Sequence, residues 1–208
     1  APRDETEIAP RRTLAWAQRA RDLHDSWGGS SRGQAVFGIV QGGTQPDLRK
    51  ERARQLTAMD FDGYAVGGRS VGETQAQMEV ALDAAVSELP KDKLRYMMGV
   101  GMPDDLTMAT SRGVDMFDCV LPTRLGRSNT TLVPGGWLKM RNKQYADDPR
   151  PLQEGCTCYT CRNFSRAYIR HLAVAKEMLA GILQSIHNIH FLQQHMAAIR
   201  ARVPIKTK

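Results

Sequence analysis

The chain has 208 residues, 41% of them hydrophobic, and a formal net charge of +7. This length is enough for one sizeable core, or for one domain with an appendage. No apolar run approaches the length of a membrane span, and the N-terminal segment APRDETEIAPRR lacks the features of a signal peptide, so we expect a soluble, cytoplasmic protein with no membrane partner.

From about residue 34 to 123, short apolar runs alternate with helical stretches, and a helix near 11–25 precedes them. The apolar runs are VFGIV (36–40), GYAVGG (63–68), LRYMMGVG (94–101) and MFDCVL (116–121). Strands that are apolar on both faces and separated by helices are typical of parallel βα units. The pattern predicts an α/β fold, either a small open sheet or half of a (β/α)8 TIM-type barrel, and does not choose between them.

Polar residues and glycines gather where these predicted strands end. They are Gln41, Gly67, Gly68, Met98, Gly99 and Asp118. Both architectures place their active sites at the carboxyl ends of the strands. A glycine there can simply make a turn, and Asp118 can be a turn residue, so position alone marks an edge of the sheet and not a function.

After Pro122 the pattern changes to a β-hairpin near 135–142, a loop over 147–155 and two helices. The apolar residues of these helices recur at helical spacing. They are Phe164, Tyr168, Leu172, Ala175 and Leu179 in the first helix, and Ile182, Ile186, Ile189, Met196 and Ile199 in the second. We therefore divide the chain into residues 1–140, which hold the strand ends, and residues 141–208, a C-terminal subdomain.

The positive charge lies in the C-terminal subdomain. Residues 1–140 contain 18 Lys/Arg and 18 Asp/Glu, whereas residues 141–208 contain 11 and 4. A basic block beside a neutral body suits a phosphate backbone; a solvated basic face is the alternative. A membrane surface is disfavoured, because no strongly basic amphipathic helix with large apolar anchors is present.

Three of the four cysteines, Cys156, Cys158 and Cys161, lie within six positions. Structural zinc sites take four thiolate or imidazole ligands, so the fourth ligand must come from elsewhere. The candidates are His171, His187, His190 and His195, and spacing does not choose among them. The alternative is a set of free or disulfide-bonded thiols, which is disfavoured for a protein expected in the cytosol. We expect a closed, structural Zn²⁺ site.

Six motifs together resemble one family. They are FGIVQGG (37–43), GYAVGGRSVGE (63–73), RYMMGVG (95–101), MFDCVLPTR (116–124), GCTCYTCRNFSRAYIRHL (155–172) and SIHNIHFL (185–192). They closely resemble the bacterial queuine/tRNA-guanine transglycosylases, in register from about residue 12 to 200. The resemblance implies the second half of a (β/α)8 barrel with a C-terminal zinc-binding subdomain. It also implies exchange of guanine for a 7-deazaguanine base at the tRNA wobble position, and a homodimer for the full-length family.

The resemblance also implies roles for individual residues. Asp118 is the expected nucleophile, and Arg124 and Arg127 are expected to hold the backbone of the tRNA anticodon loop. The expected base contacts are Gln41, Gly67, Gly68, the backbone of Arg69, and Met98. The expected zinc ligands are Cys156, Cys158, Cys161 and His187.

These residue types suit the implied chemistry. Breaking an N-glycosidic bond develops positive charge on the ribose, which a carboxylate below C1′ can stabilise and then capture covalently. A side-chain amide can pair with a purine edge, and glycines let backbone groups approach the base. The target base must first be splayed out of the anticodon loop.

Full-length members of this family carry the first half of the barrel before the matched region. That half holds two aspartates, one for proton transfer and one for base recognition, and we assign no counterpart of either in this chain. We therefore expect a fragment with impaired activity alone. One alternative is a non-catalytic, zinc-dependent tRNA-binding or partner subunit, although such a role does not need a carboxylate among phosphates. Another is a relative that acts on DNA or on archaeal tRNA, which the compact zinc segment disfavours.

Overall fold

The computed structural model describes residues 3–67 and 74–202, and the chain divides into two compact units. The first comprises Ala1–Val100 and Asp104–Asp118, and the second Gly101–Pro103 and Cys119–Lys208. The compact units therefore divide after Asp118. The division into 1–140 and 141–208, which groups residues by expected role, stays a prediction.

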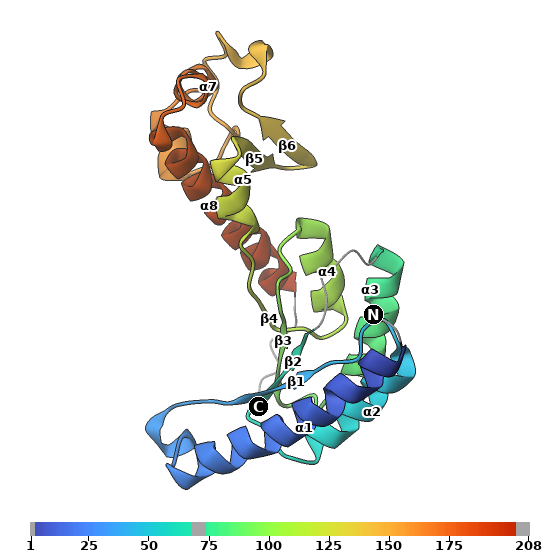
Figure 1. Cartoon of the computed structure of the whole chain (residues 1–208). Helices are drawn as coiled ribbons and strands as arrows, with labels where there is room; N and C mark the ends of the chain where they lie inside the picture. Colours follow the sequence, from blue (N-terminus) through green and yellow to red (C-terminus); the bar gives the residue numbers. More distant parts are fainter. Residues whose placement is uncertain (1–2, 68–73, 203–208) are drawn as a thin grey trace. The chain divides into compact units, whose positions relative to one another are not determined.

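The first unit is built on a four-stranded parallel sheet (Figure 1). Its strands lie in chain order, β1 (Phe37–Val40), β2 (Gly63–Val66), β3 (Leu94–Met97) and β4 (Met116–Phe117). The helices are α1 (Arg3–Ser26), α2 (Pro46–Thr57), α3 (Gln75–Val86) and α4 (Pro103–Ser111), with a 3-10 turn, η1 (Ser30–Arg32), before β1. Strand and helix alternate from β1 to β4, so the predicted α/β class with parallel strands is confirmed.

Local sequence explains where the connecting helices start. Pro46 occupies the first turn of α2, where its missing N–H costs no helical hydrogen bond. At α3, Thr74 and Gln77 form a reciprocal capping box that satisfies two amide groups. Asp104 and Asp105 lie in the first turn of α4, where negative charge favours the helix dipole.

The core of the first unit lies between the sheet and its helices. Every residue of β2 is buried, as expected for an inner strand of a parallel sheet. Val40, Tyr64, Val66, Leu82 and Met97, from β1, β2, α3 and β3, are fully buried in one cluster. This packing fixes the strands, and their carboxyl ends therefore share one edge.

The second unit is a hairpin with four helices. Its elements are α5 (Leu121–Arg127), β5 (Thr130–Val133), β6 (Gly136–Lys139), η2 (Lys143–Tyr145), α6 (Tyr159–Asn163), α7 (Arg166–Val174) and α8 (Met178–Arg202). A separate apolar cluster forms its core and includes Met140, Leu152, Ile169 and Leu183. Among residues 3–67 and 74–202, no helix is both long and apolar enough to cross a membrane.

Two boundaries in the second unit differ from the sequence-based prediction. The hairpin spans 130–139 and not 135–142, because the β-branched run that begins at Thr130 supplies its first strand. The break between the last two helices falls at Lys176, whose φ of 63° is left-handed. A left-handed residue ends a helix, so Leu179 belongs to α8.

The apolar face predicted for the last helix is largely exposed. Ile182, Ile186 and Ile189 are 53%, 36% and 44% exposed. The buried residues of α8 are Ala180, Leu183, Gln184, His187 and Asn188. Apolar spacing therefore located the helix but not its buried face, which is decided by hydrogen bonds to α5 and β5.

Candidate functional site

Asp118 lies directly after β4, at the carboxyl edge of the sheet, with an exposed side chain. The hydroxyl of Tyr96 donates to Oδ1 of Asp118 at 2.7 Å, and the backbone N–H of Gly99 donates to the same oxygen at 2.8 Å. The Tyr96 bond, followed by the Gly99 amide, lowers the pKa of Asp118. Asp118 is therefore held ionised and oriented through Oδ1, and neither of these donors bonds to Oδ2.

Neither Tyr96 nor Gly99 was singled out from the sequence as a partner of Asp118. The signal was present in the register of the neighbouring strands, since Tyr96 pairs with Met116 on β4. Side chains two residues apart on a strand share a face. A long donor at position 96 can therefore reach a carboxylate two residues beyond its partner.

Three of the predicted base contacts lie at the ends of neighbouring strands. Gln41 follows β1, Gly67 follows β2, and Met98 follows β3. A Cβ at Gly67 would lie 3.2 Å from Nε2 of Gln41 and 2.8 Å from Cγ2 of Ile39. The Gln41 amide therefore lies against the Gly67 backbone, where a larger residue would displace it.

Two other predicted base contacts, Gly68 and Arg69, lie outside the described residues. Met98 is 36% exposed, so its thioether side chain is accessible from solvent at this edge. Its N–H donates to Val66 O at 3.4 Å, which extends the ladder between β2 and β3 by one step. The expected roles in base contact stay predictions.

Arg49 joins the first two of these strand ends, and no feature of the sequence marked it. Its side chain is fully buried. Nε donates to Gly43 O at 2.7 Å and Nη2 donates to Gly67 O at 3.0 Å. Because a buried guanidinium must be hydrogen-bonded, Arg49 ties the loop that contains Gln41 and Gly43 to the neighbouring strand end at Gly67.

The second unit brings Cys156, Cys158, Cys161 and His187 together as a group that could hold a metal ion. Their ligand atoms all lie within 4.8 Å of one another. The Nδ1 atom of His187 lies 3.6, 3.5 and 3.3 Å from the three Sγ atoms in chain order. Tetrahedral zinc bonded to sulfur at about 2.3 Å and to nitrogen at about 2.05 Å separates these atoms by about 3.6 Å. The donor set and its spacing thus fit zinc.

Secondary structure presents these four ligands. Cys158 caps α6, where its Sγ accepts from the Cys161 N–H at 3.3 Å. His187 is fully buried on α8, and its Nε2 lies 2.8 Å from Leu132 O. That carbonyl fixes the proton on Nε2 and leaves Nδ1 as the ligand atom, the usual arrangement of a metal-bound histidine.

Burial also sets the protonation of the group. It raises the pKa values of Cys156 and Cys161 and lowers the pKa of His187. The neutral imidazole is therefore ready to bind a cation, whereas the thiolates need one nearby to form. The cysteines are not joined as disulfides, and His171, His190 and His195 are not part of the group.

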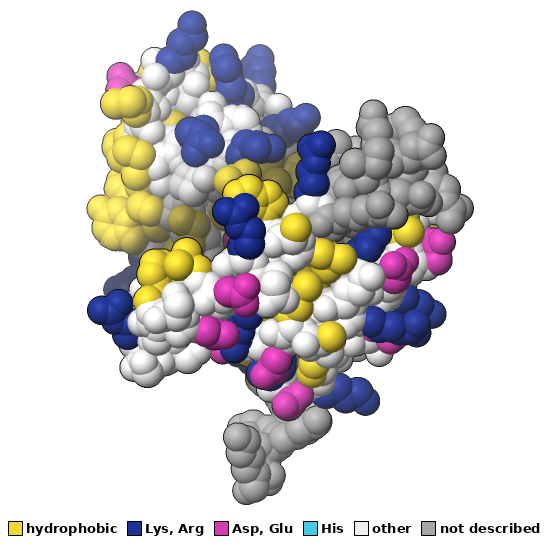
Figure 2. Space-filling view, turned by 60° about the horizontal axis from the view of Figure 1, so that its bottom comes forward, with side chains coloured by type: hydrophobic (Ala, Val, Ile, Leu, Met, Phe, Trp, Pro, Cys, Tyr) yellow, Lys and Arg dark blue, Asp and Glu magenta, His cyan; other side chains and the backbone are white. Residues whose placement is uncertain are grey.

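Arg124 and Arg127, the predicted RNA contacts, are exposed on α5. This helix lies along α8 (Figure 1). A Cβ at Gly126 would lie 2.3 Å from Ser185 Oγ, so only glycine allows this approach. Lys and Arg side chains are spread over the face drawn in Figure 2, among acidic, hydrophobic and uncharged ones. Contact with RNA stays a prediction.

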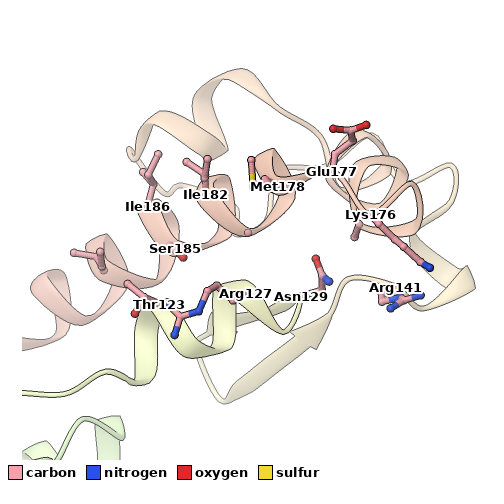
Figure 3. Close-up of a pocket in the computed structure, with 13 residues that line it drawn as sticks. Thr123, Arg127, Asn129, Arg141, Lys176, Glu177, Met178, Ile182, Ser185 and Ile186 are labelled. Atoms are coloured by element: carbon pink, nitrogen blue, oxygen red, sulfur yellow. The ribbon is translucent and has the colours of Figure 1, made fainter.

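A groove of about 720 Å³ lies within the second unit. Met178, Ile182 and Ile186 project from α8 on one side, and Thr123 and Arg127 from α5 lie opposite (Figure 3). Met178 is 84% exposed, more than any other large hydrophobic side chain among the described residues. An apolar surface of this kind is typical of an interaction site.

Comparison with known proteins shows which family this chain resembles. The family model described as queuine tRNA-ribosyltransferase matches residues 1–207. Relatives named queuine tRNA-ribosyltransferase include one from Thermoanaerobacter pseudethanolicus, 53% identical over 92% of this chain and 50% of its own length. Those from Desulforamulus reducens and Ruegeria pomeroyi are 50% and 47% identical over 92% and 98% of this chain, and 50% and 53% of their own lengths.

The chain spans about half the length of the curated relatives it matches, and the match is to their C-terminal half. The family model and the relatives agree over nearly the whole of this chain. The chain belongs to the queuine tRNA-ribosyltransferase family.

Proposed function

We propose that this chain supplies the catalytic half of a tRNA-guanine transglycosylase, a pentosyltransferase that exchanges guanine at the tRNA wobble position for a 7-deazaguanine base. The observation that carries the proposal is the exposed, ionised Asp118, oriented by Tyr96 and Gly99 at the carboxyl edge of the sheet. The name of its relatives, queuine tRNA-ribosyltransferase, gives the same class of transfer.

Asp118 would act as the nucleophile. With Oδ1 held by its two donors, Oδ2 attacks C1′ of the wobble ribose as the bond from C1′ to guanine breaks. The bonding electrons leave with guanine, which takes up a proton. The incoming base then attacks C1′, loses its own proton, and releases the Asp118 carboxylate. Two displacements at one carbon retain its configuration.

The base would lie beside Gln41 and Gly67. The Gln41 amide offers both a donor and an acceptor to a purine edge, and the lack of a side chain at Gly67 lets backbone groups approach. Arg49 supports this proposal, since it ties the loop that contains Gln41 to the strand end at Gly67. Gly68, the backbone of Arg69, and Met98 would complete the base contacts.

The four ligands Cys156, Cys158, Cys161 and His187 would hold a structural Zn²⁺. When bound, the ion would join the cysteine loop to α8 and stabilise the fold without taking part in the reaction. The match between the sulfur–nitrogen separations and tetrahedral geometry supports this assignment. The division into a catalytic segment, 1–140, and a zinc-binding segment, 141–208, follows from these roles.

The sheet would form part of a (β/α)8 barrel. The support is a parallel sheet whose strands follow one another in chain order, each reached through a helix. The described part of the sheet has four strands, and a barrel needs four more. These could come from the same polypeptide or from another chain, and we expect impaired exchange without them.

We further propose three properties of the assembled enzyme. Arg124 and Arg127 would contact the anticodon-loop backbone, since both are exposed on α5. A second copy would cover Met178 and Ile182, because exposed apolar side chains favour burial. The enzyme would act in the cytoplasm, where its tRNA substrate is found.

An adduct assay with Asp118→Asn tests the nucleophile. The chain, alone and mixed with the N-terminal half of the Thermoanaerobacter pseudethanolicus relative, is incubated with a tRNA transcript carrying guanine at the wobble position. A denaturing gel then detects RNA bound covalently to protein. In the mixed sample we expect an adduct with the unaltered chain and none with the Asp118→Asn variant, because an amide is a poor nucleophile.

Asp115→Asn is the matched control. Asp115 is an exposed carboxylate just before β4 that accepts from the N–H of Arg95, and its substitution should preserve the adduct. An adduct that survives Asp118→Asn would overturn the assignment. Tight tRNA binding with neither adduct nor guanine exchange in the mixed sample would instead support a non-catalytic tRNA-binding subunit.

A further inference from the structure

The buried side of α8 carries three polar side chains. Gln184, His187 and Asn188 are each fully buried. A buried polar group is costly unless it is hydrogen-bonded, so their partners show what this side of the helix does. His187 belongs to the metal group, whereas Asn188 has no part in the proposed chemistry.

Asn188 joins α8 to α5 and to the hairpin. Its Oδ1 accepts from the Leu132 N–H at 2.8 Å. Its Nδ2 donates to Pro122 O and to Thr130 O, both at 3.0 Å. Both amide protons and the oxygen are therefore used, and the three contacts bracket α5, which begins beside Pro122 and ends just before Thr130.

The short helix α5 depends on such contacts. It has seven residues, and an isolated helix of that length is not stable in water. At Gly126 the backbone of α5 lies directly against the backbone of α8. A small shift between the two helices would therefore displace α5. Arg124 and Arg127 lie on this helix and move with it.

The same contacts connect α5 to the metal group. Leu132 is held on both sides, since its N–H bonds to Asn188 and its carbonyl lies 2.8 Å from Nε2 of His187. These two α8 residues are consecutive. Metal binding at His187 would therefore order Leu132 and, through Asn188, the first turn of α5.

We propose that Asn188 is a positioning residue, which fixes α5 against α8 and so holds Arg124 and Arg127 where RNA can reach them. The inference rests on the proposed role of these arginines in RNA contact. The inference also gives the metal group a role in RNA binding. A bound metal would favour RNA binding through His187, Leu132 and Asn188 without itself touching RNA.

Asn188→Ala tests the proposal, with hydrogen exchange of the α5 amides and affinity for the tRNA transcript as readouts. We expect faster exchange in α5, and an affinity that falls to that of the Arg124→Ala/Arg127→Ala variant. The slope of log affinity against log salt should become shallower by about 1.4, for two lost contacts to single-stranded phosphates. Gln194→Ala, at an exposed position on the same helix, should change neither readout.

Two further variants separate positioning from general loss of structure. Asn188→Asp keeps the acceptor for Leu132 but loses the donors to Pro122 and Thr130. It should retain bound zinc while α5 exchanges faster. Asn188→Ala combined with the two arginine substitutions should bind tRNA no more weakly than the arginine variant alone, because all remove the same contacts.

Unchanged exchange in α5, or losses of affinity that add together, would overturn the role of Asn188. If Arg124→Ala/Arg127→Ala leaves tRNA affinity unchanged, the proposed RNA contact is wrong, and so is this function of α5. Faster α5 exchange in Asn188→Ala would then identify a purely structural residue. The two failures are therefore distinguishable.

Discussion

Asp148 is the carboxylate whose loss should most weaken the second unit. Its side chain is 6% exposed and lies between Arg150 and Arg166, which are 61% and 14% exposed. Oδ1 accepts from the backbone N–H and Nε of Arg150, and Oδ2 accepts from Nη2 of Arg150 at 2.7 Å and Nη1 of Arg166 at 3.2 Å. This cluster holds the loop that leads to Cys156.

Asp148→Asn should lower the free energy of unfolding by about 3 kcal/mol. The amide can replace one oxygen but turns its NH2 group toward two donors. A hydrogen bond to a charged group contributes about 1.5–3 kcal/mol when buried, which applies to Arg166. The Arg150 pair is exposed to solvent and adds little, because water screens it. A loss of about 3 kcal/mol is also near the lower end of the cost of breaking a buried ion pair from one side.

Urea unfolding measures this change. Trp137 lies in the second unit, and Trp16→Phe with Trp27→Phe removes the other two tryptophans, so fluorescence then reports on this unit alone. With a slope of about 2 kcal/mol per molar urea, the midpoint should fall by about 1.5 M. Asp147→Asn is the matched control, because Asp147 is an exposed neighbour, and it should shift the midpoint little.

The pH dependence gives a second check. Bonds to Arg150, chiefly, lower the pKa of Asp148 well below its ordinary value. Its contribution is therefore complete above the unfolded pKa, about 3.9, and is lost as pH falls through the folded pKa. The difference in the free energy of unfolding between the unaltered chain and Asp148→Asn should be constant between pH 7 and about pH 5, and it should shrink in stronger acid. The reasoning would be refuted if Asp148→Asn and Asp147→Asn had equal urea midpoints. It would also be refuted if the stability difference between the unaltered chain and Asp148→Asn were the same at all pH values.

Two other substitutions test the two candidate sites. Tyr96→Phe removes a donor to Asp118, so adduct formation should slow by about tenfold, as expected for about 1.4 kcal/mol. The pKa of Asp118 should rise, so the acid limb of the pH–rate profile should move to higher pH; an unchanged profile would contradict this. Cys158→Ser should reduce bound zinc from about one ion per chain to near none, because a hydroxyl does not replace a thiolate. Cys119→Ser should retain the ion, and elemental analysis that finds equal zinc in both variants would remove Cys158 from the site.

The α/β class could be read from the sequence because its signal is local. A run such as VFGIV is apolar on both faces, and each run is followed by a helix with its own start signal, such as Pro46 or the Thr74 capping box. The cysteine spacing was equally local and predicted three metal ligands. The choice of His187 followed from family resemblance, and the structure brings that histidine to the cysteines.

The second unit was harder to predict because its packing depends on distant contacts. Lys176 ends α7 in a left-handed conformation that its residue type does not suggest. The isoleucines of α8 marked a helix but not its buried face, because the bonds of Asn188 reach residues more than 50 positions away.

The sequence by itself determined the alternation of strands and helices in the first unit, the cysteine cluster and the family, since these depend on residue types at short spacing. Only the tertiary structure decided which donors hold Asp118, that Arg49 ties the loop that contains Gln41 to Gly67, and which side of α8 is buried. The physical reason is that a hydrogen bond between distant segments depends on where folding brings each group. Spacing along the chain does not carry that information.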